Sequence, residues 1–114
     1  MKQEYKELLL KDLCARLPYG VIIEVYGESQ SVTEVLHNIT DEGNIEISYT
    51  TVNVETIKPY LRPMSSMTEE ERKEYYTLEH ACYKQTDWLN AHHFDYRGLI
   101  EKSLAIVAPD NMYK

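Results

Sequence analysis

The chain has 114 residues, of which 43% are hydrophobic and 27% charged, and its formal net charge is −7. This length suits one domain, because two independent cores of half the size would bury too little surface to be stable. No apolar run approaches the roughly 20 residues that a membrane-spanning helix needs, and the first ten residues are not typical of a signal peptide. We therefore expect a single domain over residues 1–114 that is cytoplasmic and has no membrane partner.

The negative charge is spread evenly along the chain. Residues 1–63 carry six Lys and Arg against ten Asp and Glu, and residues 64–114 carry six against nine. A protein that binds a duplex usually concentrates positive charge to displace the counterions of the phosphates. Nucleic acid is therefore an unlikely partner.

The first predicted element is a helix over residues 5–17. Pro18 should end it, because proline disfavours helical geometry at the residue before it. Without a secretion signal, we expect Cys14 and Cys82 to be reduced thiols that are buried as small hydrophobic side chains. The apolar positions of the helix recur every four residues, as in a helix packed on a core: Tyr5, Leu9, Leu13 and Leu17.

The hydrophobic period changes from 3.6 to 2 in the next segment, which is typical of strands. The second strand has apolar residues on both parities, which a bulge or burial on both faces would explain. Gly43 is available for positive φ in a hairpin turn, and short loops favour antiparallel neighbours. We expect a sheet over residues 21–57 with strands at 21–26, 31–39, 44–51 and 52–57.

Two prolines mark residues 58–63 as a stiff connector that is neither central strand nor helix interior, because each proline lacks a backbone donor. Thr68 and Glu71 have the spacing of a capping box. A helix should therefore begin at Thr68 and run to about Lys84. Its inward-facing side chains would be Tyr75, Leu78 and Cys82.

The rest of the chain predicts two further short helices within a helical region over residues 68–107. Thr86 or Asp87 is placed to cap one of them, and Asp95 to cap the other. Gly98 within the last helix suggests close packing against a neighbour. This helix must bury an apolar face against the sheet, another helix or a second copy, and a homodimer is one common solution. The face consists of Tyr96, Leu99, Ile100, Leu104 and Val107.

Three stretches of the sequence also carry a resemblance to a known family: DWLNAHHFDYRGLIEK with the ending APDNMYK, KPYLRPMSSMTEEE and LLLKDLCARLPYG. Together they cover about half of the chain. With these stretches, the chain resembles a family of small uncharacterised proteins of gut anaerobic bacteria and their phages. The resemblance implies an origin in a phage or mobile element, and it implies no activity.

The segment 86–100 holds the only Trp, the only Phe and two His of the chain. His92, His93 and Asp95 are metal-binding residue types, but adjacent helical residues point about 100° apart, so the two histidines should not share a metal. We therefore expect no metal and no other cofactor, with one histidine packed against Trp88 and the other at a helix end. We assign no catalytic residue.

A thiol-dependent site is disfavoured by spacing, because His80 and Cys82 lie two residues apart on a helix and point in nearly opposite directions. Arg and Tyr often dominate interfaces, so Tyr96 and Arg97 suggest recognition. An equally good interpretation is an ion pair between Arg97 and Glu101. The candidate binding surface consists of Trp88, His92, His93, Asp95, Tyr96 and Arg97.

These observations predict an α+β fold. A small antiparallel sheet of three or four strands, which could curl into an SH3-like partial barrel, would be flanked by an N-terminal helix and two or three C-terminal helices. The leading hypothesis for function is a non-enzymatic protein-interaction module of mobile-element or phage origin, with a protein as its partner. The alternative is a metal- or thiol-dependent hydrolase that uses His92, His93 and Asp95.

Overall fold

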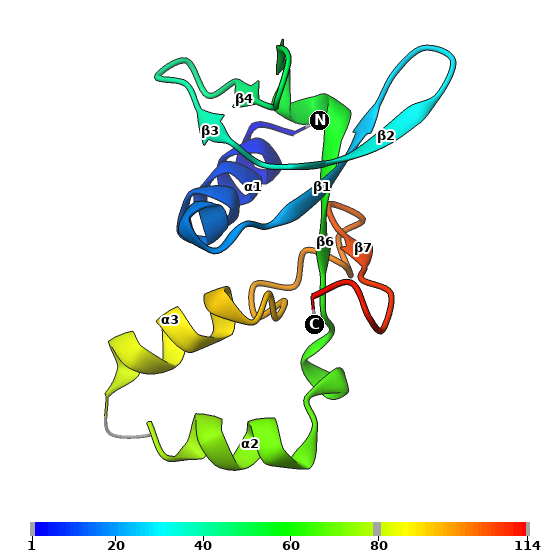
Figure 1. The fold of residues 1–114 in the computed structure, drawn as a ribbon. Coiled ribbons are helices and arrows are strands. Elements are labelled where there is room, and N and C mark those ends of the chain that lie inside the picture. The colour runs from blue at the N-terminus through cyan, green and yellow to red at the C-terminus, as the bar shows by residue number, and fades with distance from the viewer. Residues whose placement is uncertain (1, 79–80, 114) are drawn as a thin grey trace.

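The computed structural model describes residues 2–78 and 81–113 and shows an α+β fold. One half holds an N-terminal helix and the strands, the other holds two further helices, and strand β6 runs between them (Figure 1). The elements in chain order are α1 (Gln3–Arg16), η1 (Leu17–Tyr19), β1 (Ile22–Tyr26), β2 (Ser31–Val35), β3 (Asn38–Ile39), β4 (Ile45–Glu46), β5 (Thr51–Val52), η2 (Val54–Thr56), β6 (Ile57–Leu61), η3 (Met64–Ser66), α2 (Glu69–Tyr76), α3 (Cys82–Ala91) and β7 (Ile106–Val107), where η marks a 3₁₀ turn.

The N-terminal helix is confirmed, and its buried stripe explains its position. Leu9, Asp12, Leu13 and Arg16 are buried and recur at helical spacing. Pro18 lies in the 3₁₀ turn that follows. The prediction that Cys14 and Cys82 are buried is wrong, because both thiols are free and exposed on the solvent sides of their helices.

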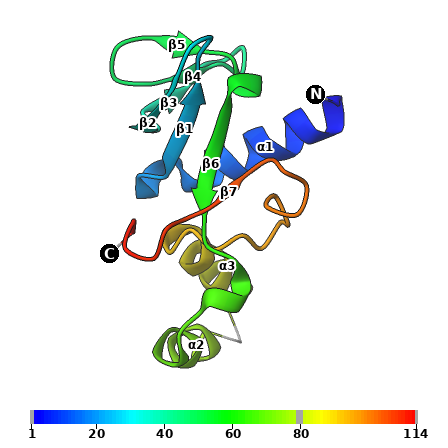
Figure 2. The same cartoon turned by 90° about the vertical axis from the view of Figure 1, so that its right-hand side faces the viewer.

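The larger sheet has the strand order β2-β1-β6-β7 and is mixed rather than purely antiparallel. Strands β1 and β2 form an antiparallel hairpin, and β1 also pairs antiparallel with β6. Strand β7 joins β6 in parallel, a pairing that requires a long crossover connection, which the helical half supplies. Figure 2 shows β6 standing beside β1, with β7 crossing near its lower end.

Residues 58–61 form a strand, so the expectation of a non-strand connector over 58–63 is wrong. Strand β6 bonds β1 along Ile57–Pro59 and β7 along Tyr60–Leu61. Ile22 donates its N–H to Tyr113, away from β2, and backbone groups alternate sides along a strand. Pro59 pairs with Ile23, and its backbone nitrogen, which carries no hydrogen, is therefore on the side of β6 away from β1. Strand β7 begins to pair only at Tyr60, so no hydrogen bond of the sheet is lost at Pro59. Proline is tolerated at such a locally open position.

The smaller sheet has the order β3-β4-β5. The predicted strand 31–39 is divided between the two sheets: Leu36 donates to Val21 of the larger sheet, and His37 donates to Glu46 of the smaller one. This change of sheet, rather than a bulge, places apolar residues on both parities.

Gly43 turns the β3–β4 hairpin with φ of 80°. The predicted strands 44–51 and 52–57 are shortened by the turn 47–50 and by η2. Over the described residues, neither sheet closes into a barrel.

The helical half begins where the sequence predicts and then departs from the prediction. Thr68 and Glu71 form both hydrogen bonds of a capping box at the start of α2. Helix α2 ends at Tyr76 rather than near Lys84, and α3 begins at Cys82, so Thr86 and Asp87 lie inside a helix instead of capping one.

The predicted last helix over 96–107 is replaced by turns. Gly98 and Ser103 have φ of 75° and 63°, in a region that an α-helix excludes. Gly98 therefore serves a backbone conformation rather than close packing. Leu99 and Leu104 are buried in the main core, so these two members of the apolar stripe pack internally.

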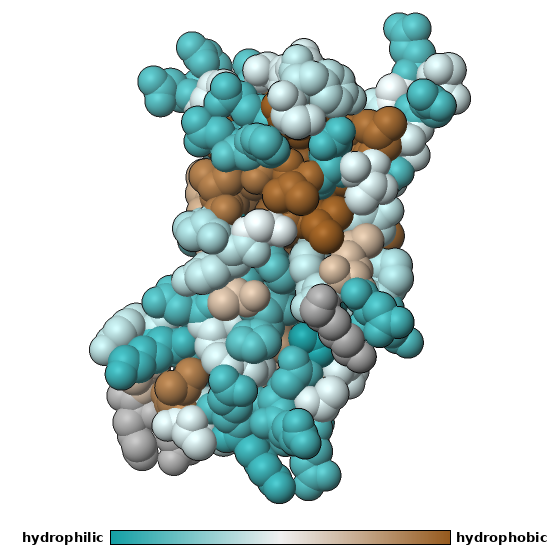
Figure 3. Space-filling view, viewed as in Figure 1, coloured by the Kyte–Doolittle hydropathy of each residue, from teal (hydrophilic) through white to brown (hydrophobic). Residues whose placement is uncertain are grey.

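The described residues form two hydrophobic clusters. The larger one joins α1, the strands and the segment after Gly98, and the smaller one joins Trp88, Leu89 and Phe94 with parts of α2. Figure 3 shows apolar side chains gathered over the half with α1 and the strands, whereas the half with α2 and α3 is mostly hydrophilic on this face. None of the helices over the described residues is long and apolar enough to cross a membrane.

Candidate functional site

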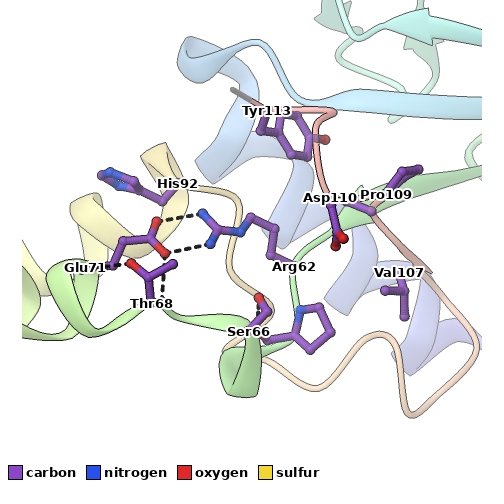
Figure 4. A pocket seen from close by; sticks show the side chains of 11 residues that line it. Arg62, Ser66, Thr68, Glu71, His92, Val107, Pro109, Asp110 and Tyr113 are labelled. Carbon is purple, nitrogen blue, oxygen red and sulfur yellow. Dashed lines mark hydrogen bonds and ion pairs between the residues drawn. The ribbon is translucent and has the colours of Figure 1, made fainter.

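A cleft of about 440 Å³ lies where the two halves meet, within the usual size range of small-ligand pockets. The end of β6, the turn η3, the start of α2, the end of α3 and the C-terminal segment contribute its walls (Figure 4). The lining residues are Arg62, Pro63, Ser66, Thr68, Glu71, His92, Val107, Ala108, Pro109, Asp110 and Tyr113.

The central feature of the cleft is a two-pronged ion pair between Arg62 and Glu71. Nη1 and Nη2 of Arg62 donate to the two carboxylate oxygens at 2.8 and 2.7 Å. The guanidinium also lies 4.1 Å above the ring centre of Phe94, a cation–π contact. The hydrogen bonds from Arg62 lower the pKa of Glu71 to about 2, against an opposing effect of desolvation. Arg62 is therefore held rigidly by contacts on two sides.

His92 belongs to the aromatic cluster that supports the cleft. Its ring stacks on Trp88 with a centroid distance of 4.0 Å, and its Nδ1 donates to the Trp88 carbonyl at 2.9 Å. His92 is also the C-cap of α3. This geometry confirms that one histidine packs on the tryptophan. Trp88 is 8% exposed, as predicted.

His93 points to a different neighbour. It adopts φ of 61°, is buried, and stacks on Tyr113 with a centroid distance of 3.9 Å. Burial, together with the positive charge of Arg16, lowers the pKa of His93 to about 4. The imidazole is therefore neutral at physiological pH.

Tyr113 fastens the C-terminal segment to the sheet. Its hydroxyl accepts from the N–H of Ile22 at 3.0 Å and donates to the carbonyl of Tyr60 at 2.6 Å. Burial raises the pKa of this hydroxyl to about 12, so it remains a hydrogen-bond donor at all ordinary pH values. The upper wall of the cleft is fixed by this contact.

Asp95 has a structural role in the loop that it opens. Its two carboxylate oxygens accept the N–H groups of Leu99 and Ile100 at 2.8 and 2.9 Å. The residue caps a turn, as its position suggested, although no helix follows. Both oxygens are thereby occupied by backbone donors.

Arg97 and Tyr96 complete an ionic cluster with α1. Arg97 donates to Asp12 at 2.8 Å, so its ion pair is with a buried carboxylate rather than with Glu101, the partner in one of the two interpretations of the sequence. Arg16 donates to both oxygens of Asp12 and, at 2.6 Å, to the carbonyl of Phe94. Tyr96 lies under the Arg97 guanidinium at 4.6 Å. Two cations thus share one carboxylate between the halves.

The six residues of the predicted surface therefore stay close in sequence but face different neighbours. Trp88, His93 and Asp95 are buried, while His92, Tyr96 and Arg97 are partly exposed. No group of three His, Cys, Asp or Glu side chains suited to a metal occurs among residues 2–78 and 81–113. Cys82 is exposed on the first turn of α3, and His80 lies outside the described residues.

Sequence reasoning missed the residues that shape the cleft and the junction. Asp12 and Arg16 occupy the same helical stripe as Leu9 and Leu13, and this spacing is a signal that they are buried together. The pairing of Arg62 with Glu71 and the docking of Tyr113 join distant segments, so the sequence holds no local signal for either.

Comparisons with protein-family models, with curated proteins and with solved structures found no match for this chain.

Proposed function

We propose that this protein is a non-enzymatic interaction module and that a segment of a protein partner docks in the cleft around Arg62. The observation that carries the proposal is a cleft of about 440 Å³ whose central charged pair, Arg62 with Glu71, is already engaged in structure. Arg62 and Glu71 neutralise each other through two hydrogen bonds, so their geometry suits positioning better than proton transfer. An origin in a phage or mobile element is a further proposal that rests on the sequence resemblance.

The chemistry of the lining suggests the kind of segment that fits. Val107, Pro109 and Pro63 supply apolar contact surface, and Asp110 supplies an exposed carboxylate at the rim. The whole chain carries a net charge of −7, which attracts a positively charged partner at long range. We therefore propose a partner segment that combines a basic side chain with apolar neighbours.

The hydrolase alternative receives less support from the geometry. His92 stacks on Trp88, His93 stacks on Tyr113, and Asp95 accepts two backbone N–H groups. A hydrolytic site needs its nucleophile, base and stabilising donors within hydrogen-bond reach of one reacting atom. These three side chains are instead directed to three separate sets of neighbours.

A matched pair of variants tests the proposal. Val107 lies on the cleft and is 52% exposed, while Tyr49 lies in the turn 47–50, outside the cleft, and is 68% exposed. Partner capture from a host lysate should lose a specific protein with Val107→Glu and keep it with Tyr49→Glu, and binding of the purified partner should weaken with added salt. Equal capture by both variants and the wild type would exclude the cleft as the binding site.

A further inference from the structure

Strand β2 is the least protected edge of the larger sheet. It is the outermost strand in the order β2-β1-β6-β7, and none of the described segments pairs with its outer side. The opposite edge, β7, is only two residues long, whereas β2 runs over the five residues Ser31–Val35. Natural edges are usually blocked by lysine, proline, a bulge or shortness. The sequence SVTEV of β2 has no lysine or proline.

The hydrogen-bonding phase of β2 shows which residues face outward. Leu36 donates its N–H to Val21 at 3.0 Å, on the inner side. Backbone groups alternate sides along a strand in an antiparallel ladder, so Val32 and Glu34 direct theirs to β1. Ser31, Thr33 and Val35 therefore present their N–H and C=O groups to solvent, ready for another strand.

We infer that a second copy of this chain pairs with this edge, antiparallel and about a twofold axis at Thr33. With this register, Thr33 faces Thr33 of the second copy and Ser31 faces Val35. All three outward-facing residues are then hydrogen-bonded. If the second copy is shifted by two residues in either direction, one of these three residues no longer lies opposite an outward-facing residue and loses its hydrogen bonds.

Side-chain charge also favours this register. The only charged residue of β2 is Glu34, and it faces Val32 of the second copy rather than its own equivalent. The register centred on Glu34 would place two carboxylates directly opposite each other, which is destabilising. The arrangement at Thr33 avoids that repulsion without any countercharge.

The same register accounts for two exposed apolar side chains. Tyr26 and Val35 are 44% and 45% exposed, and Tyr26 faces Ser31 within the hairpin. Val35 of the second copy would lie beyond Ser31 on the same face, because opposite residues share a face in an antiparallel pair. Small Ser31 leaves room for Tyr26 to contact that valine, and the twofold axis repeats the contact. Figure 3 shows apolar side chains at the surface over β2.

The size of the interface sets its strength. One strand pair with its neighbouring side chains belongs to the small class of interfaces, below about 1,200 Å² in total. The dimer should accordingly be reversible, with a dissociation constant of tens of micromolar. This surface is separate from the cleft, so the two proposals stand or fall independently.

Sedimentation equilibrium with matched variants tests the inference. The wild type should approach dimer mass at about 100 µM, Val35→Lys should be a folded monomer by circular dichroism, and Val107→Lys should dimerise like the wild type. A wild-type monomer at that concentration would overturn the proposal, as would equal dimerisation of Val35→Lys.

Cross-linking tests the register without relying on a disruptive change. In a background with Cys14→Ser and Cys82→Ser, Thr33→Cys should form a disulfide-linked dimer under mild oxidation. Val35→Cys should cross-link poorly with itself but well when mixed with Ser31→Cys. Preferential self-linking of Val35→Cys, or no cross-link for Thr33→Cys, would overturn the proposed pairing.

Discussion

The half with α1 and the strands and the half with α2 and α3 are held together by different kinds of contact. The buried hydrophobic residues of the first half are all Leu, Ile, Val or Ala, and most are completely inaccessible. Among the described residues, the hydrophobic cluster of the second half buries Trp88, Leu89 and Phe94, and Trp88 stacks on His92 and Phe94. A small core that cannot bury much area gains additional stability from directed aromatic contacts. Removing one aromatic ring should therefore destabilise mainly the second half, whereas a cavity in the aliphatic core should destabilise the first half more widely.

The two halves meet at a buried ionic cluster rather than at a continuous apolar layer. Asp12 and Arg16 are inaccessible to solvent, and Arg97 completes the set. A guanidinium hydrogen of Arg16 reaches the carbonyl of Phe94, next to the aromatic cluster. Nη1 of Arg16 is buried without a partner among the described residues. Such a junction is sensitive to loss of any one charge, because the remaining charges would be buried without compensation.

The largest expected effect comes from removing the shared carboxylate. Asp12→Ala should lower the free energy of unfolding by about 5 kcal/mol, because breaking a buried ion pair costs 3–5 kcal/mol and two cations lose their partner here. Urea denaturation measures this change. Asp87→Ala, at an exposed aspartate on α3, is the control and should change stability by less than about 0.5 kcal/mol. Similar values for both variants would mean that the cluster does not couple the halves.

Removing the aromatic centre of the second half should have the next largest effect. Trp88→Ala should cost about 3 kcal/mol, at the lower end for a large core aromatic, because its buried Nε1 has no hydrogen-bond partner within residues 2–78 and 81–113. Hydrogen exchange should show α2 and α3 losing protection while β1 and β6 keep theirs. Tyr83→Ala, on the same helix at a 69% exposed position, should leave the exchange pattern unchanged. Uniform loss of protection across both halves would contradict the contrast between them.

The buried imidazole of His93, between the two halves, should make the free energy of unfolding fall in mild acid. The folded-state pKa of His93 is about 4 against an ordinary 6.5, so the unfolded chain takes up a proton first as pH falls. This contribution is fully present above pH 6.5 and is lost as pH falls towards 4, by about 2 kcal/mol. His93→Asn keeps a residue that tolerates positive φ and should flatten the pH dependence of the unfolding free energy in this window. An unchanged slope, with His92→Asn as the control for losing an imidazole, would rule out this origin.

The smallest effect concerns the ion pair at the cleft. The pKa of Glu71 is about 2, below its usual 4.5, chiefly because Arg62 donates to it. The stabilisation is therefore present above pH 4.5 and is lost as pH falls towards 2. Because solvent screens the partly exposed pair, Glu71→Gln should cost about 1 kcal/mol at pH 7 and nothing near pH 2. Thermal denaturation against pH measures this, with the exposed Glu70→Gln as control; a pH-independent difference would point to the lost cap hydrogen bond instead.

Local signals in the sequence predict local structure well. The i, i+4 stripe predicts α1, the spacing of Thr68 and Glu71 predicts the capping box, and Gly43 predicts the hairpin turn. These features depend on residues within one turn of each other. The prediction of burial for the only Trp is also confirmed.

The failures occur where tertiary neighbours decide the conformation. Pro59 is accepted in β6 because β1 pairs with residues 57–59 of this strand and β7 pairs only with residues 60 and 61. No short stretch of sequence reveals this arrangement. The apolar positions from Tyr96 onward satisfy a helical period, yet the backbone requirements of Gly98 and Ser103 prevail. The cleft combines five separate segments, and so its existence could not be read from any one of them.

The parallel pairing of β6 with β7 has a consequence for the kinetics of folding. Tyr60 and Leu61 pair with Ile106 and Val107, so closing this ladder encloses about two fifths of the chain in one loop. Loop-closure entropy must be overcome before such a distant contact stabilises anything. Helix α1 and the β1–β2 hairpin use near neighbours and should form early. We therefore expect the last strand, with Tyr113 behind it, to dock in the slowest step, after α2 and α3 have already formed.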